Sequence, residues 1–595
     1  MINRRIKRNI VAQGICIPLT QRLALALSIC LFSPLLFAQM TIDIDVSGVD
    51  KILENNIRLF LSLEQQKKHA LMSEGRLRRL HKKAPKEITR ALQPFGYYRP
   101  LIKTELVQTS DSNWRASYSV DLGPPLLIGK FDFTISEEMA EDPEFRQLND
   151  NLPLYKGKIF NHLEYETIKT DLARLAAERG YVDARFTQHR VAIDLKTYEA
   201  SITLHYDGGR RYRFGTVKLE QDLLEPQLLQ RYIPFERGSP YNHDALIDLQ
   251  QALNDSNYFQ TAEVSPGQPQ ADIAEIPVTV ALTPRKPHRY GLGLGYGTDT
   301  GARTSFSWEV PRVNRHGHRF NSEVKISEFG YSLSASYRVP VLNPRTDQMI
   351  YNIGQVNEKT DVSDSTVRTI GANLNRNRGP WRESLSVNYQ VEEFVVGSDK
   401  GESTLLMPGV NWSRSWGNNI VTSFDGIRFD IGLRGAREDL LSDVSFLQLQ
   451  GGIKAINRLG QRNRLITRGR IGTTWTQDFH QLPSSVRFFA GGAQSVRGFG
   501  YQSLGPRDDR GEVIGGSHLM VGSIEFEHSL NDKWGAAAFY DAGNAMNSFA
   551  DKLERGAGLG IRWRSPIGPV RIDLATAISR EDHPWRLHFS IGPDL

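Results

Sequence analysis

The carboxy-terminal half of the chain, from about His288, consists of short segments in which apolar and polar residues alternate. The alternation is clear near the end, where Ala557, Leu559, Ile561 and Trp563 share one face and glycine and arginine occupy the other. Since the side chains of a strand point alternately to its two faces, this pattern predicts strands with one apolar and one polar surface. Sixteen such segments fit into these 308 residues, which leaves room for the roughly 9 to 11 residues that a membrane-spanning strand needs.

Two folds have strands of this kind. A soluble two-layer β-sandwich is the alternative to a membrane barrel. The number and length of the segments favour the barrel, as do the tryptophans near strand ends at Trp381, Trp534 and Trp585. Closure of a barrel also satisfies every backbone polar group inside the hydrocarbon. We therefore expect an all-β, 16-stranded antiparallel transmembrane barrel over residues 288–595.

The first 38 residues have a different pattern. Five lysines and arginines precede an uncharged apolar run from Leu23 to Ala38, which is the layout of a secretory signal peptide. A transmembrane anchor is the alternative, but Pro34 and about 16 apolar or small residues fall short of the roughly 20 that a spanning helix needs. We therefore expect residues 1–38 to be a cleaved signal peptide. No later stretch approaches 18 apolar residues, which argues against helical membrane spans.

Removal of this leader changes the composition. The formal charge of +6 falls to about +1, because five cations and no acids leave with it, so the basic balance does not indicate a nucleic-acid partner. Cys16 and Cys30 leave too, and they are the two cysteines of the sequence. The mature chain therefore cannot rely on disulfides in an oxidising compartment.

Residues 41–287 contain three similar units of about 80 residues each. In each unit a helical segment ends at Gly96, Gly180 or Asn257, directly before an aromatic residue. Glycine and asparagine tolerate the left-handed conformation that closes a helix. Each unit is predicted to be strand–helix–helix–strand–strand, an α+β arrangement. The expected boundaries are 41–121, 122–208 and 209–287.

The first strand expected in the barrel, residues 290–297, has glycine at every second position, opposite tyrosines and leucines. A dinucleotide-binding loop is the alternative, but the strict spacing of two indicates one face of a strand. A glycine face offers little side-chain packing, so the seam between the first and last strands is expected to be weak. The residues expected to form a lateral gate at this seam are Tyr290, Leu292, Gly293, Gly295, Trp585, Leu587, Phe589, Ile591 and Gly592.

The longest connection between expected strands, at about 481–515, follows the eleventh strand and contains Val-Arg-Gly-Phe at 496–499. Turns after even-numbered strands are short, so this loop lies on the outer side if the repeats are periplasmic. A solvated arginine is the alternative for Arg497. The glycine and aromatic content of the loop favours folding back into the lumen, where Asp541 is the expected partner of Arg497. The expected lumenal loop–barrel lock consists of Val496, Arg497, Gly498, Phe499, Glu525, Phe539, Asp541 and Gly543.

These strings resemble the Omp85 family. The shared features are the Val-Arg-Gly-Phe loop tip, the Phe-x-Asp-x-Gly strand at 539–543, and the string 558–573, which ends in Ser-Pro-x-Gly-Pro-x-Arg-x-Asp. The three repeats resemble the polypeptide-transport-associated (POTRA) domains of that family. Three such units, and the ending 589–595 in place of a terminal phenylalanine, look most like its translocation and assembly branch.

The resemblance implies a non-enzymatic insertase in the bacterial outer membrane, with POTRA domains in the periplasm. The implied partners are a TamB-like inner-membrane-anchored periplasmic protein, unfolded outer-membrane protein or autotransporter clients, and outer-membrane lipid. The implied mechanism is lateral opening between the first and last strands. A two-partner secretion translocator, which normally has two POTRA units and a plug helix, and a lipid conduit or scaffold remain as alternatives.

The sequence argues against a phosphate-binding loop, a metal site and a hydrolase. The segment Gly123–Lys130 has five residues between its glycines instead of four, and Phe131 replaces the Ser or Thr of a phosphate-binding loop. His316 and His318 lie two apart, without an apparent third metal ligand. Neither Gly-x-Ser-x-Gly nor His-Glu-x-x-His occurs, which argues against a hydrolase. We expect no catalytic residues, no cofactor and no metal.

Overall fold

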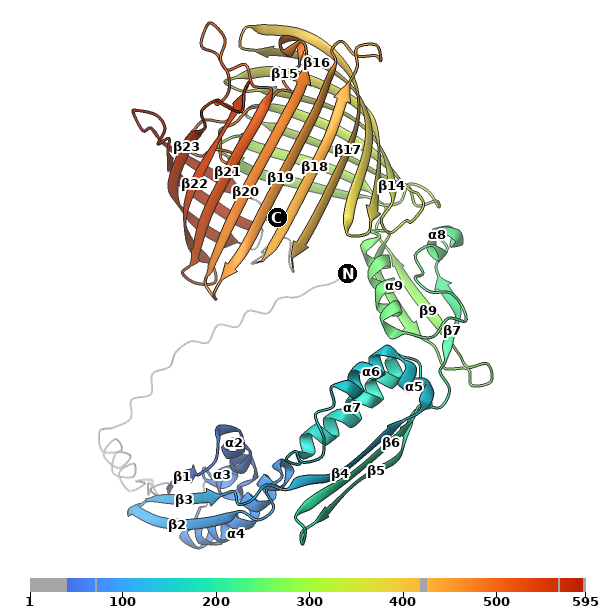
Figure 1. Cartoon of the computed structure of the whole chain (residues 1–595), viewed down its shortest axis with the longest axis vertical. Helices are drawn as coiled ribbons and strands as arrows, with labels where there is room; N and C mark the ends of the chain where they lie inside the picture. Colours follow the sequence, from blue (N-terminus) through green and yellow to red (C-terminus); the bar gives the residue numbers. More distant parts are fainter. Residues whose placement is uncertain (1–39, 70–71, 418–424, 566–567, 592–595) are drawn as a thin grey trace, which may run out of the picture. The chain divides into compact units, whose positions relative to one another are not determined.

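The computed structural model describes residues 40–69, 72–417, 425–565 and 568–591. The signal peptide expected at 1–38 and Gly592 lie outside these residues. These described residues divide into two compact units, with the boundary between Tyr212 and Arg213 (Figure 1). The first unit holds two three-stranded sheets, and the second holds one three-stranded and one 16-stranded sheet. In the part of the chain that is described, no helix combines the length and apolar character needed to cross a membrane.

The first α+β repeat is built on a sheet of order β1-β3-β2, in which β1 is parallel and β2 antiparallel to β3. Helix α4 packs on this sheet because Leu77, Ala84 and Ile88 recur on one face and are fully buried with Tyr118. The Ser73 hydroxyl caps its first turn by accepting the Arg76 N–H. The elements are β1 (Thr41–Ser47), α2 (Lys51–Phe60), α3 (Ser62–Gln66), α4 (Glu74–Leu92), η1 (Gln93–Phe95), β2 (Leu101–Ser110) and β3 (Asn113–Asp121).

The second repeat has the same topology, with sheet order β4-β6-β5. It joins the first repeat at Gly96, whose carbonyl accepts the Leu126 N–H at 2.8 Å. Gly96 has a φ of +90°, and a Cβ there would lie 2.4 Å from the Phe160 carbonyl oxygen, so the junction requires glycine. The elements are β4 (Leu127–Ile135), α5 (Glu137–Glu141), α6 (Pro143–Asp150), α7 (His162–Glu178), β5 (Arg185–Asp194) and β6 (Glu199–Asp207).

The third repeat, of sheet order β7-β9-β8, belongs to the second unit and contacts the barrel turns. The Tyr258 hydroxyl donates to the Gly317 carbonyl at 2.6 Å, and the Tyr232 hydroxyl donates to the Pro344 carbonyl at 3.2 Å. Buried tyrosines thus fix this repeat to the turns after β11 and β13. The elements are β7 (Arg213–Glu220), α8 (Pro226–Gln230), α9 (His243–Asp255), β8 (Phe259–Pro266) and β9 (Glu275–Pro284).

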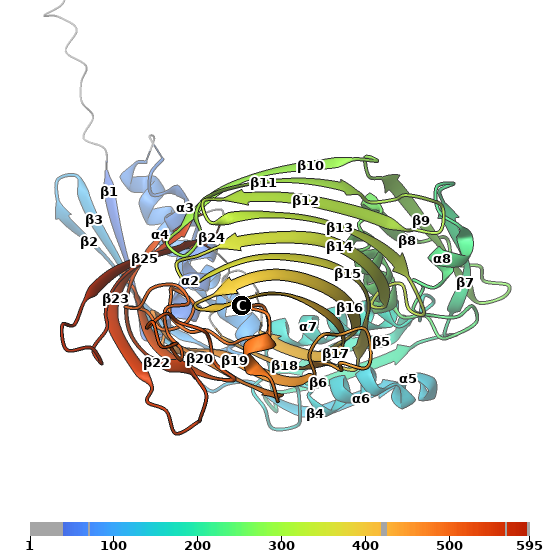
Figure 2. The ribbon, with the colours of Figure 1, turned by 90° about the horizontal axis from the view of Figure 1, so that it is seen from above.

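The barrel consists of sixteen strands, each antiparallel to the next in chain order (Figure 2). Alternate residues face outward, as at Leu294 and Leu559, which are 82% and 69% exposed. The predicted fold class is confirmed. The strands are β10 (Arg289–Gly297), β11 (Gly301–Val310), β12 (Arg319–Ser327), β13 (Gly330–Pro340), β14 (Gln348–Lys359), β15 (Ser363–Arg378), β16 (Trp381–Val396), β17 (Asp399–Gly417), β18 (Gly426–Ala436), β19 (Phe446–Leu459), β20 (Asn463–Thr476), β21 (His518–Ser529), β22 (Trp534–Met546), β23 (Glu554–Ser565), β24 (Gly568–Thr576) and β25 (Trp585–Ile591).

Candidate functional site

The loop between β20 and β21, residues 477–517, enters the barrel lumen, and we call it the lock loop. Its base is held by Arg487, which donates to an Asp399 carboxylate oxygen at 2.7 Å and to the carbonyls of His480 and Ile514 at 2.8 and 3.0 Å. On the neighbouring wall, Glu392 accepts hydrogen bonds from the Ser484 and Ser485 side chains. Charge-assisted bonds to β16 and β17 therefore fix where the loop starts.

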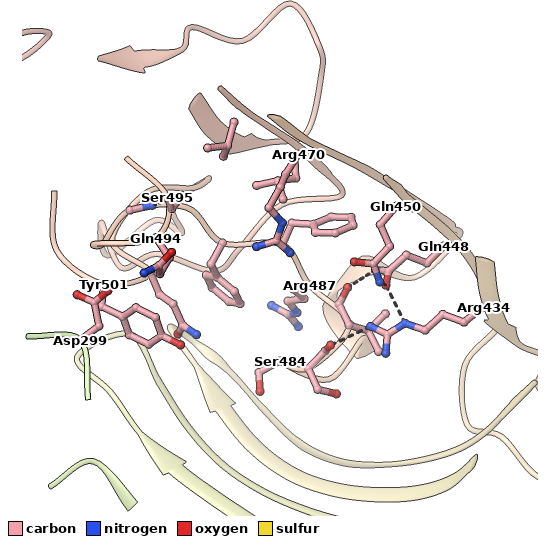
Figure 3. A pocket seen from close by; sticks show the side chains of 18 residues that line it. Asp299, Arg434, Gln448, Gln450, Arg470, Ser484, Arg487, Gln494, Ser495 and Tyr501 are labelled. Carbon is pink, nitrogen blue, oxygen red and sulfur yellow. Dashed lines mark hydrogen bonds between the residues drawn. The ribbon is translucent and has the colours of Figure 1, made fainter. Parts of the chain in front are cut away.

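A cavity of about 350 Å³ lies between this loop and the wall formed by β18 to β21 (Figure 3). Arg434 lines it and donates to Gln448 Oε1 at 2.8 Å and to the Ser485 carbonyl at 3.1 Å. Arg470 and Gln450 line the same space. The wall next to the loop base is thus lined by polar and charged side chains.

The tip of the lock loop packs against the wall through apolar side chains. Val496 and Phe499 are buried against Leu519, Val521 and Ala577. These contacts come from β21 and from the segment after β24, so the tip spans several strands. The two apolar residues therefore flank Arg497 and exclude water from it.

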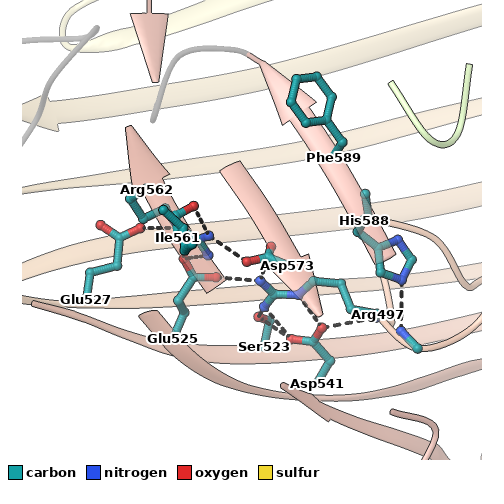
Figure 4. Close-up of polar contacts among 12 residues, drawn as sticks. Arg497, Ser523, Glu525, Glu527, Asp541, Ile561, Arg562, Asp573, His588 and Phe589 are labelled. Carbon is teal, nitrogen blue, oxygen red and sulfur yellow. Dashed lines mark hydrogen bonds and ion pairs between the residues drawn. The ribbon is translucent and has the colours of Figure 1, made fainter. Parts of the chain in front are cut away.

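Arg497 is 2% exposed and makes five hydrogen bonds from its side chain (Figure 4), equal to the five N–H donors of a guanidinium. Two of them go to the two oxygens of Asp541, from Nε at 2.7 Å and from Nη2 at 2.8 Å. Nη1 donates to Glu525 at 2.6 Å and to Asp573 at 3.1 Å. The loop cation is therefore shared between β21, β22 and β24.

One face of the guanidinium is also covered. Its carbon lies 3.4 Å from the centre of the Phe539 ring, a cation–π contact. The Arg497 backbone N–H donates to Asp541 at 3.0 Å as well. Both the side chain and the main chain of this one residue are thus bound to β22.

A second arginine extends the network along the wall. Arg562 on β23 contacts Glu525 at 2.7 Å, Glu527 at 2.9 Å and Asp573 at 2.5 Å. Arg464 on β20 contacts Glu527 at 2.5 Å. Arginines on β20 and β23 and carboxylates on β21, β22 and β24 therefore form one network with Arg497, in which each buried charge has a partner of opposite sign.

Gly498 connects the loop tip to the last strand. Its φ is +95°, and a Cβ there would lie 2.8 Å from the Thr576 carbonyl carbon. Its N–H donates to His588 Nε2 at 3.0 Å. His588 is buried on β25, so the lock loop contacts the strand at the barrel seam.

The structure brings the predicted lock residues together around Arg497. Gly543 contributes close packing, since a Cβ there would lie 2.6 Å from the Met520 carbonyl oxygen. Four residues outside the predicted lock also belong to the site: Ser523, Arg562, Asp573 and His588. The residue parity of the last strands was the available signal, because it places Arg562, Asp573 and His588 on the lumenal face.

The seam between β10 and β25 differs from every other strand pair. Among the described residues no ladder register joins the two strands, which are the ends of the 16-stranded order. The hydrogen bonds across the seam join Thr298, the residue after β10, to Phe589 on β25. Thr298 N and Oγ1 donate to the Phe589 carbonyl at 3.4 and 3.5 Å, and Phe589 N donates to Thr298 Oγ1 at 3.3 Å. The barrel is nearly closed, and few hydrogen bonds between described residues cross its seam.

The predicted gate residues lie along this seam. Tyr290 and Leu292 on β10, and Trp585 and Leu587 on β25, are exposed on the lipid-facing side. The Phe589 ring lies 6.1 Å from that of Tyr296. The other predicted gate residues that the structure describes, Gly293, Gly295 and Ile591, line a cavity of about 600 Å³.

His316 and His318, the histidine pair noted in the sequence, lie at the turn before β12 with their rings 5.9 Å apart. His316 contacts a Glu225 carboxylate oxygen at 3.0 Å, and His318 contacts the Tyr337 hydroxyl at 2.8 Å. In the described part of the chain, no cluster of three potential metal ligands is found. Their contacts are thus to the third repeat and to the neighbouring strand.

A 16-stranded barrel with an apolar outer face, N-terminal α+β repeats and a loop bound inside the lumen defines an outer-membrane barrel protein with periplasmic repeats. A family model for the Omp85 superfamily domain matches residues 279–594, more than half of the chain. The chain belongs to the Omp85 superfamily, as its sequence motifs indicated. A second model, for POTRA domain TamA domain 1, matches residues 43–122.

Relatives and solved structures agree with this assignment. The chain is 21% identical over 584 residues to the outer membrane protein assembly factor BamA of Nitratidesulfovibrio vulgaris, covering 92% of this chain and 72% of that protein. It is 20% identical to BamA of Neisseria meningitidis serogroup B, covering 85% and 72%. The crystal structure of BamA from Haemophilus ducreyi lacking POTRA domains 1–3 superposes with a TM-score of 0.65 at 17% identity. The match covers 78% of this chain and 99% of that one, and it shows that the two share a fold. The barrel lies in the outer membrane, with the N-terminal repeats in the periplasm.

Proposed function

We propose that this protein is a non-enzymatic insertase resembling TamA, which helps autotransporters and other outer-membrane proteins enter the bilayer. Its partner would be a TamB-like inner-membrane-anchored periplasmic protein. The match of residues 43–122 to a TamA POTRA model supports this branch of the family, and the two BamA relatives named above are assembly factors.

The observation that carries the proposal is the seam. Opening β10 from β25 breaks the few hydrogen bonds between Thr298 and Phe589, instead of a full antiparallel ladder. Opening would expose two strand edges to which an unfolded client strand can add by main-chain hydrogen bonds. The lock loop fills part of the lumen, which favours lateral insertion over export of a passenger through the pore.

The test is a covalent lock across the seam. Cys16 and Cys30 are the natural cysteines, so a Thr298→Cys, Phe589→Cys pair can be oxidised selectively once both are replaced by serine. We expect the oxidised pair to slow insertion of an autotransporter barrel into proteoliposomes by about tenfold or more, with recovery after reduction.

The matched control joins two strands that are already paired. Leu574 and Leu587 are register partners on β24 and β25, so Leu574→Cys, Leu587→Cys adds a crosslink without closing the seam. Insertion by the oxidised control should equal that of the reduced protein. Normal insertion by the oxidised Thr298–Phe589 variant would refute lateral opening and leave a two-partner secretion translocator or a lipid conduit as the better function.

A further inference from the structure

Helix α4 of the first repeat has a strong excess of positive charge. Its 19 residues include seven lysines and arginines and two glutamates. Both glutamates are engaged, since Glu74 pairs with Arg78 at 2.8 Å and Glu87 accepts the Ser62 N–H at 2.9 Å. The remaining cations therefore receive little neutralisation from their own helix.

Five of these cations form one stripe. Their spacing places them within an arc of about 100° on the helix, opposite the buried face, over a length of about 17 Å. All five side chains are exposed. Within the residues that the structure describes, none of the five donates a side-chain hydrogen bond or forms an ion pair. The stripe consists of Arg79, Lys82, Lys83, Lys86 and Arg90.

This arrangement is unfavourable in the isolated protein. Like charges three or four residues apart on a helix repel, and the stripe contains such pairs at Arg79–Lys83, Lys82–Lys86 and Lys86–Arg90. An ordinary solvated helix face mixes both signs, which removes this repulsion. A bound polyanion would remove it too, so the stripe has the properties of a binding surface.

The chemistry of the stripe selects the kind of polyanion. The exposed residues of α4 are lysines, arginines, one glutamate and one glycine, with no aromatic or apolar side chain among them. Protein–protein interfaces, in contrast, depend on buried aromatic and apolar anchors. A straight row of mobile ammonium and guanidinium groups matches a flat array of phosphates, as at polybasic membrane-binding helices. The periplasm, where this repeat lies, is bordered by phospholipid leaflets.

We propose that the α4 stripe binds the phosphate headgroups of an anionic phospholipid leaflet. The apolar face of α4 is buried in the core of the repeat through Leu77, Leu80 and Ile88, so binding is electrostatic and superficial, without insertion. The proposal concerns the repeat and its periplasmic location and does not depend on the seam or on client insertion. It gives the first repeat a means of holding a membrane surface.

The experiment uses the full chain in a nanodisc of zwitterionic lipid, with cosedimentation on sucrose-loaded phosphatidylcholine vesicles with or without phosphatidylglycerol. We expect binding about tenfold or more tighter to the anionic vesicles, and weakening with added salt. Changing all five stripe residues to glutamine should abolish this preference. Changing the three lysines to arginine should retain it, because the charge is kept.

The matched control removes the same charge elsewhere in the first unit. Its five sites are exposed cations that likewise have no ion pair among the described residues: Lys103, Lys156, Arg185, Arg190 and Lys196, all changed to glutamine. This control should bind anionic vesicles as the unmodified chain does. Equal losses in both five-site variants, or unchanged binding by the stripe variant, would overturn the proposal. Soluble polyglutamate binding to the stripe as tightly as the vesicles would also overturn it, in favour of an acidic protein partner.

Discussion

At the residue scale, Arg497 shows why a single loop side chain can hold a loop of about 40 residues inside a barrel. It is paired with three carboxylates on three strands. The cost of removing this charge from water is offset only while all of these partners are in place. Loss of the cation leaves Asp541, Glu525 and Asp573 buried with fewer opposite charges. The site is therefore sensitive to any change in Arg497.

We expect Arg497→Ala to lower the free energy of unfolding of the barrel by about 3–5 kcal/mol, the usual cost of breaking a buried ion pair by removing one partner. Arg497→Lys should lose less, since it keeps the charge but cannot bind Asp541 through two nitrogens. The measurement is urea unfolding in detergent. Semi-native gels monitor it as conversion of the compact form to the unfolded form. Arg470→Ala, an exposed arginine that only lines the cavity, should change stability by less than about 0.5 kcal/mol.

A charge exchange tests the Asp541 partnership separately. The double variant Arg497→Asp, Asp541→Arg should recover part of the stability lost in each single variant. Recovery should remain incomplete, because the carboxylate introduced in the loop would face Glu525 and Asp573. Equal stability of Arg497→Ala and Arg470→Ala, or no recovery in the double variant, would contradict the role given to this pair.

At the element scale, much of the structure is predictable from the sequence, because local rules decide it. Alternation fixes which residues of a strand face lipid, as at Leu559 and Ile561. The helix ends of the repeats have the expected left-handed residues, with φ of +90° at Gly96, +85° at Gly180 and +63° at Asn257. These features depend on residues close in sequence.

The shared binding of Arg497 was not predictable in full, because it depends on the pairing of distant strands. Ser523 lies opposite Asp541 in the β21–β22 register, and Gly560 lies opposite Asp573 in the β23–β24 register. These registers bring carboxylates from three strands to one point. Alternation gives the face of each residue but not its height along the barrel axis. The sequence therefore predicted Asp541 as the partner of Arg497 and placed Glu525 in the lock, whereas Asp573, the third carboxylate that Arg497 contacts, was not assigned to the site.

Helix α4 also contributes a pH dependence to the first repeat. Burial lowers the pKa of His81 below its ordinary value of 6.5, and its ring nitrogen contacts the Tyr118 hydroxyl at 3.0 Å. A lowered pKa in the folded state means that the unfolded chain binds the proton more readily. Stability from this group is therefore present above pH 6.5 and is lost as the pH falls through and below that value.

We expect the hydrogen-exchange protection of α4 in the full chain, corrected for intrinsic exchange rates, to be lower at about pH 5.5 than at about pH 7.5. His81→Gln should flatten this dependence, while His162→Gln, at an exposed position on α7, should leave it unchanged. Protection that rises on acidification, or the same slope in His81→Gln, would show that His81 does not titrate in this way.

At the scale of the whole molecule, the first and last strands of the barrel meet at a seam where the described residues form no ladder, and the lock loop reaches this seam. Gly498 contacts His588 on β25, while the Ala493 N–H donates to Asp299 in the turn after β10 at 2.7 Å. One loop thus contacts both sides of the seam. The hydrogen bonds of the seam and the contacts of the lock loop therefore both hold the seam closed.

Thr298→Val tests how much of this closure the seam itself supplies. It removes the hydroxyl that exchanges hydrogen bonds with Phe589 and keeps a side chain of similar size. Each lost bond is worth about 0.5–1.5 kcal/mol, so hydrogen exchange of the amides in β10 and β25 should accelerate several-fold. Client insertion should also become faster if opening of the seam limits its rate. Thr304→Val removes a hydroxyl bonded to the Gly293 carbonyl inside the first hairpin, where a nine-residue register remains, so its effect at β25 should be small. Equal acceleration at β25 in both variants would mean that the lock loop, and not the hydrogen bonds of the seam, determines closure.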